Sequence, residues 1–291
     1  MLVFGGVPNN FSAQNMSLKN IIKRAPVTII GIPTLIGLTL YTYDVFMVFF
    51  TIAGLLILGE VYRMARPNGT EPNVWMGYLV YLALVGDQLL GGSQYLGSIL
   101  ILSILILMTW EMFRKKTHVL ENVASTFFAA IFVGMAMSYF ILLQQLGFEG
   151  QGGHVGGYAV LTVFIGVWTC DTMAYFVGSA IGKHKIFPRV SPNKSWEGSI
   201  AGLIGSFVAL ILIVKAGWLP GLDYIDALWL GLIAGVAGQV GDFAESLVKR
   251  DVGVKDSSNL LPGHGGAWDR LDSILFAAPL SYLYLTLVVG L

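Results

Sequence analysis

The side chains of this sequence that could do chemistry are concentrated between Gly241 and Asp272, in the segment GDFAESLVKRDVGVKDSSNLLPGHGGAWDRLD. At its start, four polar residues recur at positions i, i+3, i+4 and i+7 and so share one helix face: Asp242, Glu245, Ser246 and Lys249. Asp269 lies three residues before Asp272, so these two carboxylates also share a face. Carboxylates without a neighbouring His or Cys cluster favour Mg²⁺ or Mn²⁺ over zinc. We therefore expect Asp242, Asp269 and Asp272 to hold a divalent cation, which makes phosphate chemistry the natural function.

A glycine-rich stretch, Pro262–Gly266 (PGHGG), lies between these acids. Glycines adopt φ > 0 readily and can expose successive backbone N–H groups to an anion. Four basic residues flank the stretch: Lys249, Arg250, Lys255 and Arg270. Cations, glycine amides and a carboxylate-bound metal are the parts that phosphoryl and nucleotidyl transfer reuse, although no P-loop spacing is present. Taken singly, each basic residue is also explained by membrane topology, and His264 is equally compatible with a structural role.

A second polar segment runs from Asp171 to Gly198. Its first part places an acid, a phenol and two small residues on one helical stripe: Asp171, Tyr175, Gly178 and Gly182. Further on, Ser195 can cap the next helix, and Lys194 stands at that helix N-terminus, which is a natural site for an anion. A simple helix cap with a topology-determining charge explains the same residues equally well.

The composition indicates which elements must position these residues. The chain has 291 residues, of which 55% are hydrophobic and 12% charged, and its mean hydropathy is +0.73. A soluble domain carries about 25% charged residues, so a water-soluble fold is excluded. The 17 basic and 17 acidic residues balance, which gives no support for nucleic-acid binding. Cys170 is the single cysteine, so neither an intrachain disulfide nor a cysteine-based zinc site can form.

Apolar runs long enough to cross a bilayer predict an all-α polytopic integral membrane protein with about nine transmembrane helices. The expected spans are 26–43, 45–60, 73–91, 94–113, 123–146, 157–180, 197–217, 225–245 and 272–290. We divide the chain into an N-terminal segment (1–25), N-terminal transmembrane helices (26–150) and a C-terminal catalytic transmembrane region (151–291). Residues 1–15 lack the basic start of a signal peptide and have the character of a leader or an expression remnant.

Basic residues predict the orientation of these spans, because loops rich in Lys and Arg stay on the cytoplasmic side. With nine spans, every Lys and Arg except Lys215 falls on one side. This places the N-terminus in the cytoplasm and the C-terminus outside, in the cell (inner) membrane. Both polar segments then face the cytoplasm, so we expect the active site at the cytoplasmic ends of the C-terminal helices.

The two segments together resemble the CDP-diacylglycerol synthases, also called phosphatidate cytidylyltransferases. The signature is S-x-x-K-R-x₄-K-D-x₅-P-G-H-G-G-x-x-D-R-x-D at 246–272, and the upstream D-x-x-A-Y-x-x-G at 171–178 and S-P-x-K-S-x-E-G at 191–198 resemble a second conserved region. The resemblance is specific over about 165–275, whereas the first five spans match only in hydropathy. Asn193, Ser195 and Ala267 depart from the usual family residues, and none of these departures removes an expected ligand.

The resemblance implies Mg²⁺-dependent transfer of CMP from CTP to phosphatidate, giving CDP-diacylglycerol and pyrophosphate in phospholipid biosynthesis. One or two cations would be held by Asp242, Asp269 and Asp272, and the lipid phosphate would attack the α-phosphorus without a side-chain nucleophile. The implied catalytic residues are these three aspartates with Lys194, Lys249 and Arg270. The implied substrate-binding and phosphate-binding residues are Ser191, Lys194, Ser195, Ser246, Lys249, Arg250, Lys255, Gly263, His264, Gly265, Gly266 and Arg270. The implied supporting residues are Asp171, Tyr175, Glu197, Glu245 and Asp256, with Asp171 and Glu197 orienting a lysine or lining the cavity.

The expected partners are CTP, phosphatidate and membrane lipid, with no nucleic acid. Faces of small residues, including Gly202, Gly205 and Gly231, suit packing within the chain or between the subunits of a homodimer. Two other functions are compatible with parts of the pattern: a CTP-dependent polyprenol or phytol kinase, and an ion-coupled transporter that carries cations on its acids. The signature argues against the kinase. The clustering of acids at one end of the spans argues against the transporter. A CDP-alcohol phosphatidyltransferase would need a D-G-x-x-A-R run, which is absent.

Overall fold

A computed structural model describes residues 30–40, 43–66, 69–90, 92–147, 155–260 and 265–291. Within these ranges the chain forms helices and connecting turns, and the only β-type pairing is an isolated bridge between Lys185 and Ser195. The expected all-α class is therefore confirmed for the described part of the chain.

A short helix over Ile30–Leu40 comes first along the described chain. The helices that follow are α2 (Tyr43–Ala65), α3 (Val74–Leu90), α4 (Leu96–Arg114), α5 (Val119–Leu143), α6 (Val155–Ile181), α7 (Trp196–Lys215), α8 (Tyr224–Leu232), α9 (Gly238–Asp251) and α10 (Trp268–Tyr284). A π-helical turn, η2 (Ile233–Ala237), joins α8 to α9 in one continuous helix, and a second, η3 (Leu285–Val289), extends α10.

Within the described ranges each expected span corresponds to an apolar helical segment, and seven of these are long and apolar enough to cross a membrane. The other two, Ile30–Leu40 and Val74–Leu90, are apolar but shorter. Among the described helix ends, four differ from the prediction by four residues or more. α2 continues to Ala65 rather than residue 60, the α8–α9 helix continues to Asp251 rather than residue 245, and α5 and α10 begin at Val119 and Trp268 rather than at residues 123 and 272. The spans expected from hydropathy are too short at these ends because the terminal turns carry polar side chains.

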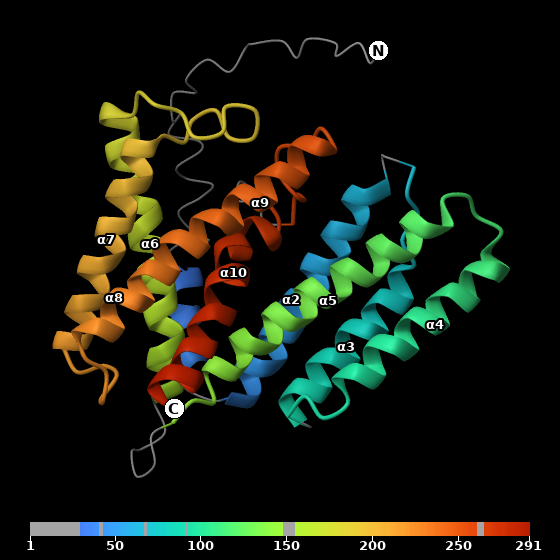
Figure 1. The fold of residues 1–291 in the computed structure, drawn as a ribbon, viewed down its shortest axis with the longest axis horizontal. Coiled ribbons are helices and arrows are strands. Elements are labelled where there is room, and N and C mark those ends of the chain that lie inside the picture. Colours follow the sequence, from blue (N-terminus) through green and yellow to red (C-terminus); the bar gives the residue numbers. More distant parts are fainter. Residues whose placement is uncertain (1–29, 41–42, 67–68, 91, 148–154, 261–264) are drawn as a thin grey trace.

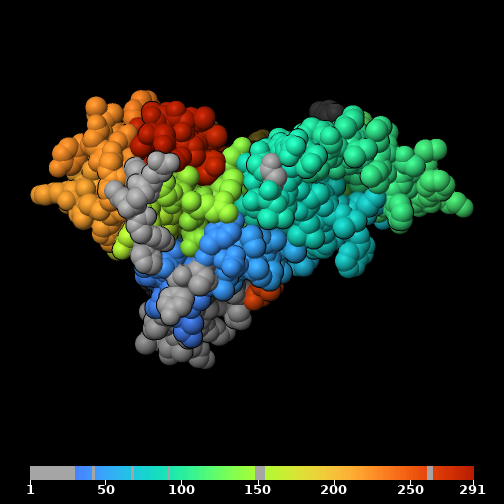
Figure 2. Space-filling view, turned by 90° about the horizontal axis from the view of Figure 1, so that it is seen from below, coloured from blue at the N-terminus to red at the C-terminus, as the bar shows by residue number. Residues whose placement is uncertain are grey.

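The helices form an elongated assembly with two ends of different make-up (Figure 1). α6, α7 and α8 lie together at one end, α3 and α4 lie at the other, and α5 runs between the two. The space-filling view also separates the orange and red C-terminal residues from the teal residues of α3 and α4 (Figure 2). α10 packs against α9, α5 and α6, so it lies between α5 and the helices of the first end.

The core lies where α2, α5 and α6 meet. Phe46 and Phe50 of α2 are buried and pack on Phe140 of α5. Their ring centroids lie 5.5 Å and 4.7 Å, respectively, from the ring centroid of Phe140. Phe140 in turn packs on Phe164 of α6 at 5.7 Å. Large apolar side chains are exposed elsewhere, including Leu105 and most of its neighbours on α4, as expected for surfaces that face lipid rather than water.

Small residues bring α6 and α7 close together next to the second polar segment. A Cβ atom added to Gly198 would lie 2.7 Å from the carbonyl oxygen of Ala174 and 3.0 Å from the Cα atom of Gly178. The two backbones therefore approach more closely than a side chain at position 198 would allow. This contact fixes the start of α7, where Lys194 and Ser195 lie, against α6.

Candidate active site

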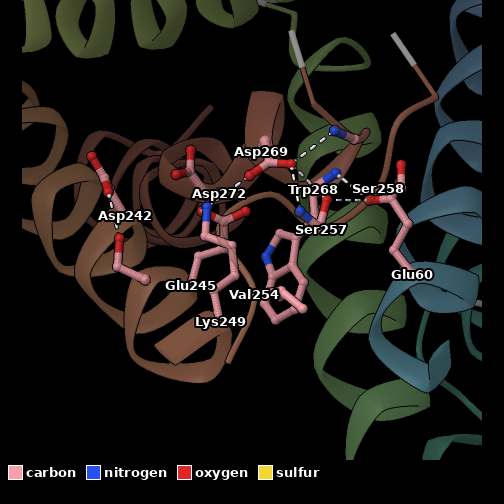
Figure 3. A network of polar contacts seen from close by, with 12 residues as sticks. Glu60, Asp242, Glu245, Lys249, Val254, Ser257, Ser258, Trp268, Asp269 and Asp272 are labelled. Carbon is pink, nitrogen blue, oxygen red and sulfur yellow. Dashed lines mark hydrogen bonds and ion pairs between the residues drawn. The ribbon is translucent and has the colours of Figure 1, made fainter. Parts of the chain in front are cut away.

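The polar stripe predicted for the helix before the glycine-rich stretch is present on α9. Lys249 lies 2.5 Å from Glu245 Oε2 and 2.7 Å from Asp269 Oδ1, so it joins α9 to the first turn of α10 (Figure 3). The Lys249 side chain is 10% exposed, and those of Glu245 and Asp269 are 2% and 5% exposed. An ammonium group between two buried carboxylates compensates charges that would be costly to bury alone.

Asp269 anchors the loop that connects α9 to α10. Its Oδ2 atom accepts hydrogen bonds from the backbone N–H groups of Gly266 at 2.7 Å and Ser257 at 2.8 Å. The Ser257 hydroxyl lies 2.7 Å from the same oxygen. We expected the Gly266 amide to bind a phosphate, but in this arrangement it donates to Asp269 and so stabilises the loop.

Glu60 of α2 is a second anchor of this loop, and the sequence analysis missed it. Its carboxylate accepts hydrogen bonds from the hydroxyls of Ser257 at 2.9 Å and Ser258 at 2.6 Å. It also accepts from the backbone N–H groups of Ala267 and Trp268, each at 2.9 Å. Figure 3 shows Glu60 reaching from α2 toward the loop on the side opposite to α9. The only signal in the sequence was an acid within an apolar span, more than 180 residues before the signature.

Lys194 and Asp242 join the two polar segments. The Lys194 ammonium lies 2.5 Å from Asp242 Oδ2 and 4.3 Å from the ring centroid of Phe243. Ser246 donates a long hydrogen bond of 3.4 Å to the other oxygen of Asp242. This ion pair is more accessible than that of Lys249, because its side chains are 27% and 29% exposed.

Asp272 and Asp171 complete an acidic region contributed by three helices. Asp272 on α10 interacts electrostatically with Asp242, Asp171 and Lys249. Asp171 on α6 interacts in the same way with Asp242 and Lys194. The structure thus brings Asp171, which we expected to have a supporting role, beside the residues of the signature.

The donor chemistry of this region suits a hard divalent cation. Hard carboxylate oxygens are the ligands that Mg²⁺ prefers, and Glu245 Oε1 is buried without a hydrogen-bond partner among the described residues. As the side chains lie, no three Asp, Glu, His or Cys residues of the described ranges converge into a preassembled metal site. A cation at Asp242 would displace Lys194 or share the carboxylate with it. A cation at Asp269 would share oxygens that already accept from Lys249 and from the backbone N–H groups of Ser257 and Gly266, with the Ser257 hydroxyl also within hydrogen-bond distance.

Residues at the start of α7 are organised as a cap. Ser195 accepts a hydrogen bond of 3.3 Å from the backbone N–H of Gly198, which confirms the predicted N-cap. Glu197 contacts His184 rather than a lysine, with 2.6 Å between Glu197 Oε1 and His184 Nδ1. Ser191 contributes to the turn before α7, where its carbonyl oxygen accepts from the backbone N–H of Lys194 at 3.4 Å.

The remaining predicted residues lie at the edge of this region or outside the described ranges. Arg250 donates to the carbonyl oxygens of Val190 and Val254, so it ties the loop before α7 to the loop after α9. Gly265 adopts the left-handed conformation, with φ of +80°. Four other predicted site residues are exposed: Tyr175, Lys255, Asp256 and Arg270. Gly263 and His264 lie outside the described residues.

Comparisons with known proteins place the chain among cytidylyltransferases by sequence. A model of the cytidylyltransferase family matches residues 22–288. The chain is 38% identical over 189 residues to the phosphatidate cytidylyltransferase of Bacillus subtilis, and this alignment covers 65% of this chain and 68% of that protein. It is 33% identical over 258 residues to the enzyme of the same name from Staphylococcus saprophyticus, with 87% and 92% covered. With the Haemophilus influenzae enzyme of that name the identity is 48% over 148 residues, covering 50% and 51% of the two chains.

Proposed function

Because this chain belongs to the cytidylyltransferase family, we propose that it transfers CMP from CTP to phosphatidate and forms CDP-diacylglycerol and pyrophosphate. The observation that carries the proposal is the contact between the two polar segments. Lys194 precedes α7 and Asp242 lies on α9, yet their charged groups are 2.5 Å apart. Cationic and acidic groups from both segments thereby share one region at the ends of helices, as a reaction between two phosphates requires.

In the proposed reaction, a phosphate oxygen of phosphatidate forms a bond to the α-phosphorus of CTP, and the bond from that phosphorus to the β-phosphate oxygen breaks. Pyrophosphate leaves with the electron pair of the broken bond. A phosphate monoester is already largely ionised at neutral pH, since its second pKa is about 6, so no strong general base is needed. The task of the protein is to position the two phosphates and to balance their charge.

Lys194 is suited to bind phosphate because its ammonium is accessible and has one acidic partner that it can exchange for a substrate oxygen. Lys249 is buried between Glu245 and Asp269. It would therefore hold Asp269 in position and contribute positive charge without contacting the phosphates directly. Arg270 and Lys255 are exposed next to the loop and would approach the phosphates of CTP or the lipid headgroup. The remaining candidates for phosphate contact are the amide of Gly265, together with Gly263 and His264, which lie outside the described residues.

A divalent cation, expected to be Mg²⁺, would be held by Asp242, Asp269 and Asp272. When bound, it would neutralise phosphate charge and polarise the α-phosphorus. Asp171 and Glu245 would add negative charge that favours one or two cations in this region. Lys194 and Lys249 pair with Asp242, Glu245 and Asp269. Asp171 and Asp272 have no such lysine partner among the described residues, and carboxylates near the membrane are costly without a cation.

The protein is an integral membrane protein, as the seven long apolar helices in the described part of the chain indicate. We propose that the N-terminus and the active site face the cytoplasm, where CTP is available, and that the C-terminus lies outside. Phosphatidate would enter from the side, with its acyl chains in lipid and its headgroup at the acids. The small-residue faces that suited packing within the chain or between subunits pack within the chain: a Cβ atom added to Gly202 would lie 2.7 Å from the carbonyl oxygen of Cys170, and one added to Gly231 would lie 2.7 Å from a ring carbon of Phe207. A homodimer stays a proposal to which these faces lend no support.

The test is release of pyrophosphate and formation of CDP-diacylglycerol by the purified protein in mixed micelles. The reaction is expected to require CTP, phosphatidate and Mg²⁺ together, and to fall by at least a factor of about 100 in Asp269→Asn. Folded wild-type protein that forms no CDP-diacylglycerol would refute the proposal. Transfer of the γ-phosphate of CTP to a lipid alcohol would then indicate a kinase, and cation movement across liposomes a transporter.

A further inference from the structure

We propose that Glu60 is a positioning residue for the reaction, which holds two separate stretches of the loop between α9 and α10 from the N-terminal half of the protein. We call these two stretches the loop anchors: Ser257–Ser258, within the loop, and Gly266–Trp268, where the loop meets α10. The proposal rests on the proposed function, because it concerns the same site. It assigns a role in that site to a helix that lies outside the family signature.

The contacts of Glu60 are divided evenly between the two anchors and between its two oxygens. Oε1 accepts from the Ser258 hydroxyl and the Ala267 backbone N–H. Oε2 accepts from the Ser257 hydroxyl and the Trp268 backbone N–H. Each oxygen therefore joins one anchor to the other, and loss of either oxygen would release one side chain and one backbone group.

Glu60 also supplies what the first turn of α10 lacks. Ala267, at the N-cap position of α10, provides no side-chain cap. The first N–H groups of a helix have no partner within the helix and carry partial positive charge. Glu60 satisfies two of these groups with a carboxylate from another helix. It is 3% exposed and, within the described chain, forms no salt bridge, so the neutral donors around it must balance its charge.

Ser257 connects Glu60 to the acids of the site. Its hydroxyl lies 2.9 Å from Glu60 Oε2 and 2.7 Å from Asp269 Oδ2, and a hydroxyl can donate to only one of them at a time. Asp269 is also bound to Lys249. A shift of Glu60 would therefore move Ser257 and Asp269, and change the placement of the residue we expect at the cation.

The substitution Glu60→Gln is a sharp test because it keeps the size of the side chain. Whichever way the amide is turned, its NH₂ group faces the backbone N–H of either Ala267 or Trp268. A serine hydroxyl can rotate to accept from that NH₂, but a backbone N–H cannot. One anchor bond is therefore lost in both orientations.

Glu111→Gln is the matched control. Glu111 is a similarly buried acid in the N-terminal half, 4% exposed, and it pairs with Arg114 on α4 rather than with the loop. We expect Glu60→Gln to lower kcat for CDP-diacylglycerol formation by a factor of about 10 to 100, measured on monodisperse protein well below its melting temperature. We also expect faster hydrogen exchange in peptides covering residues 256–270, and unchanged exchange in α3 and α4. Glu111→Gln should change neither kcat nor exchange at 256–270.

The inference is overturned if Glu60→Gln keeps the wild-type kcat and exchange, or if Glu111→Gln lowers kcat equally. Should Glu60→Gln fail to fold, Ser258→Ala removes the Ser258 bond to Glu60, together with the bond that the same hydroxyl accepts from the Leu260 backbone N–H, and leaves both backbone bonds of Glu60 in place. It should lower kcat by about two- to fivefold and speed exchange at 256–270, and wild-type values for both would overturn the inference. If the wild type forms no CDP-diacylglycerol, the proposed function fails, while the exchange data still decide whether Glu60 holds the loop.

Discussion

The two lysines of the site differ in burial, and this difference separates their contributions to activity and stability. The pair of Lys194 and Asp242 is about a quarter exposed, and exposed pairs contribute about 0–1 kcal/mol to stability. Lys249 is enclosed between two carboxylates that have little exposure of their own. Removing one partner of such a buried group costs about 3–5 kcal/mol, because the other charges stay buried.

For Asp242, we expect activity and stability to respond separately. Asp242→Asn should reduce CDP-diacylglycerol formation to background while the melting temperature in detergent stays within about 2 °C of wild type, because the lost pair is exposed. Asp44→Asn, at an exposed position in the first turn of α2, is the control and should change neither quantity. Full activity in Asp242→Asn would remove this residue from the proposed site.

For Lys249, stability should change as well. Lys249→Met leaves the carboxylates of Glu245 and Asp269 without their cation, so we expect a marked fall in melting temperature together with loss of activity. Adding Glu245→Gln removes one of the unpaired charges and should recover part of the melting temperature but not the activity. Lys116→Met, which breaks an exposed pair with Glu71, is the control and should leave the melting temperature nearly unchanged.

At this scale the sequence predicted residues that lie close together along one helix and failed for a residue brought in by the fold. Helical spacing was sufficient to place Glu245 and Lys249 on one face, and they form an ion pair. Glu60 could not be found in this way, because its partners lie 197 to 208 residues away and two of them are backbone groups. A pattern of side-chain types does not record which backbone N–H groups need a partner.

Among the elements, the close approach of α6 and α7 determines where the second polar segment meets the first. The backbones are near enough at Gly178 and Gly198 that a methyl group between them would meet main-chain atoms, which cannot rotate away. The cap at Ser195 and the ammonium of Lys194 immediately precede this contact. Their position relative to α9 thus depends on a glycine that performs no chemistry.

The expected result for Gly198→Ala is a loss of about 1–3 kcal/mol in stability from overpacking, with reduced activity because Lys194 is displaced. The measurements are the melting temperature in detergent and the rate of CDP-diacylglycerol formation. Gly86→Ala on α3 is the matched control, since a Cβ atom there would have no atom within 4 Å. If the two variants behave alike, the approach of α6 and α7 does not position the site.

Hydropathy was sufficient to locate every helical segment of the described chain but not all of their ends. The α8–α9 helix ends at Asp251, after two polar turns that a search for apolar runs excludes. The contacts of the loop after α9 were not predictable either. They depend on Gly266 and Ser257 turning their N–H groups toward Asp269, and this is decided by tertiary packing rather than by local propensity.

For the molecule as a whole, the distribution of basic residues makes a prediction that the arrangement of helices alone does not test. Lys116 follows α4 and Gln145 follows α5, so these exposed positions should lie on opposite sides of the membrane. The sole cysteine, Cys170, is buried. Wild-type protein should therefore give little background with a thiol reagent that does not cross membranes.

In spheroplasts, Gln145→Cys should react with an impermeant maleimide, whereas Lys116→Cys should react only after the membrane is permeabilised. Labelling after detergent treatment shows that each cysteine is reactive, and retained activity shows that each variant is folded. The reverse pattern would place the active site outside and contradict the proposed use of cytoplasmic CTP.

The connection from α2 to α10 also bears on the order in which the protein is made. The ribosome completes Glu60 before Trp268 by 208 residues, so α2 enters the bilayer with a carboxylate whose partners do not yet exist. The Ala267 and Trp268 donors arrive only with α10. In a chain interrupted before α10, the Glu60 carboxylate would therefore lack these two backbone donors at a position that is buried in the folded protein. The insertion of α2 and the pairing of its acid are thus separated by the synthesis of all the intervening helices.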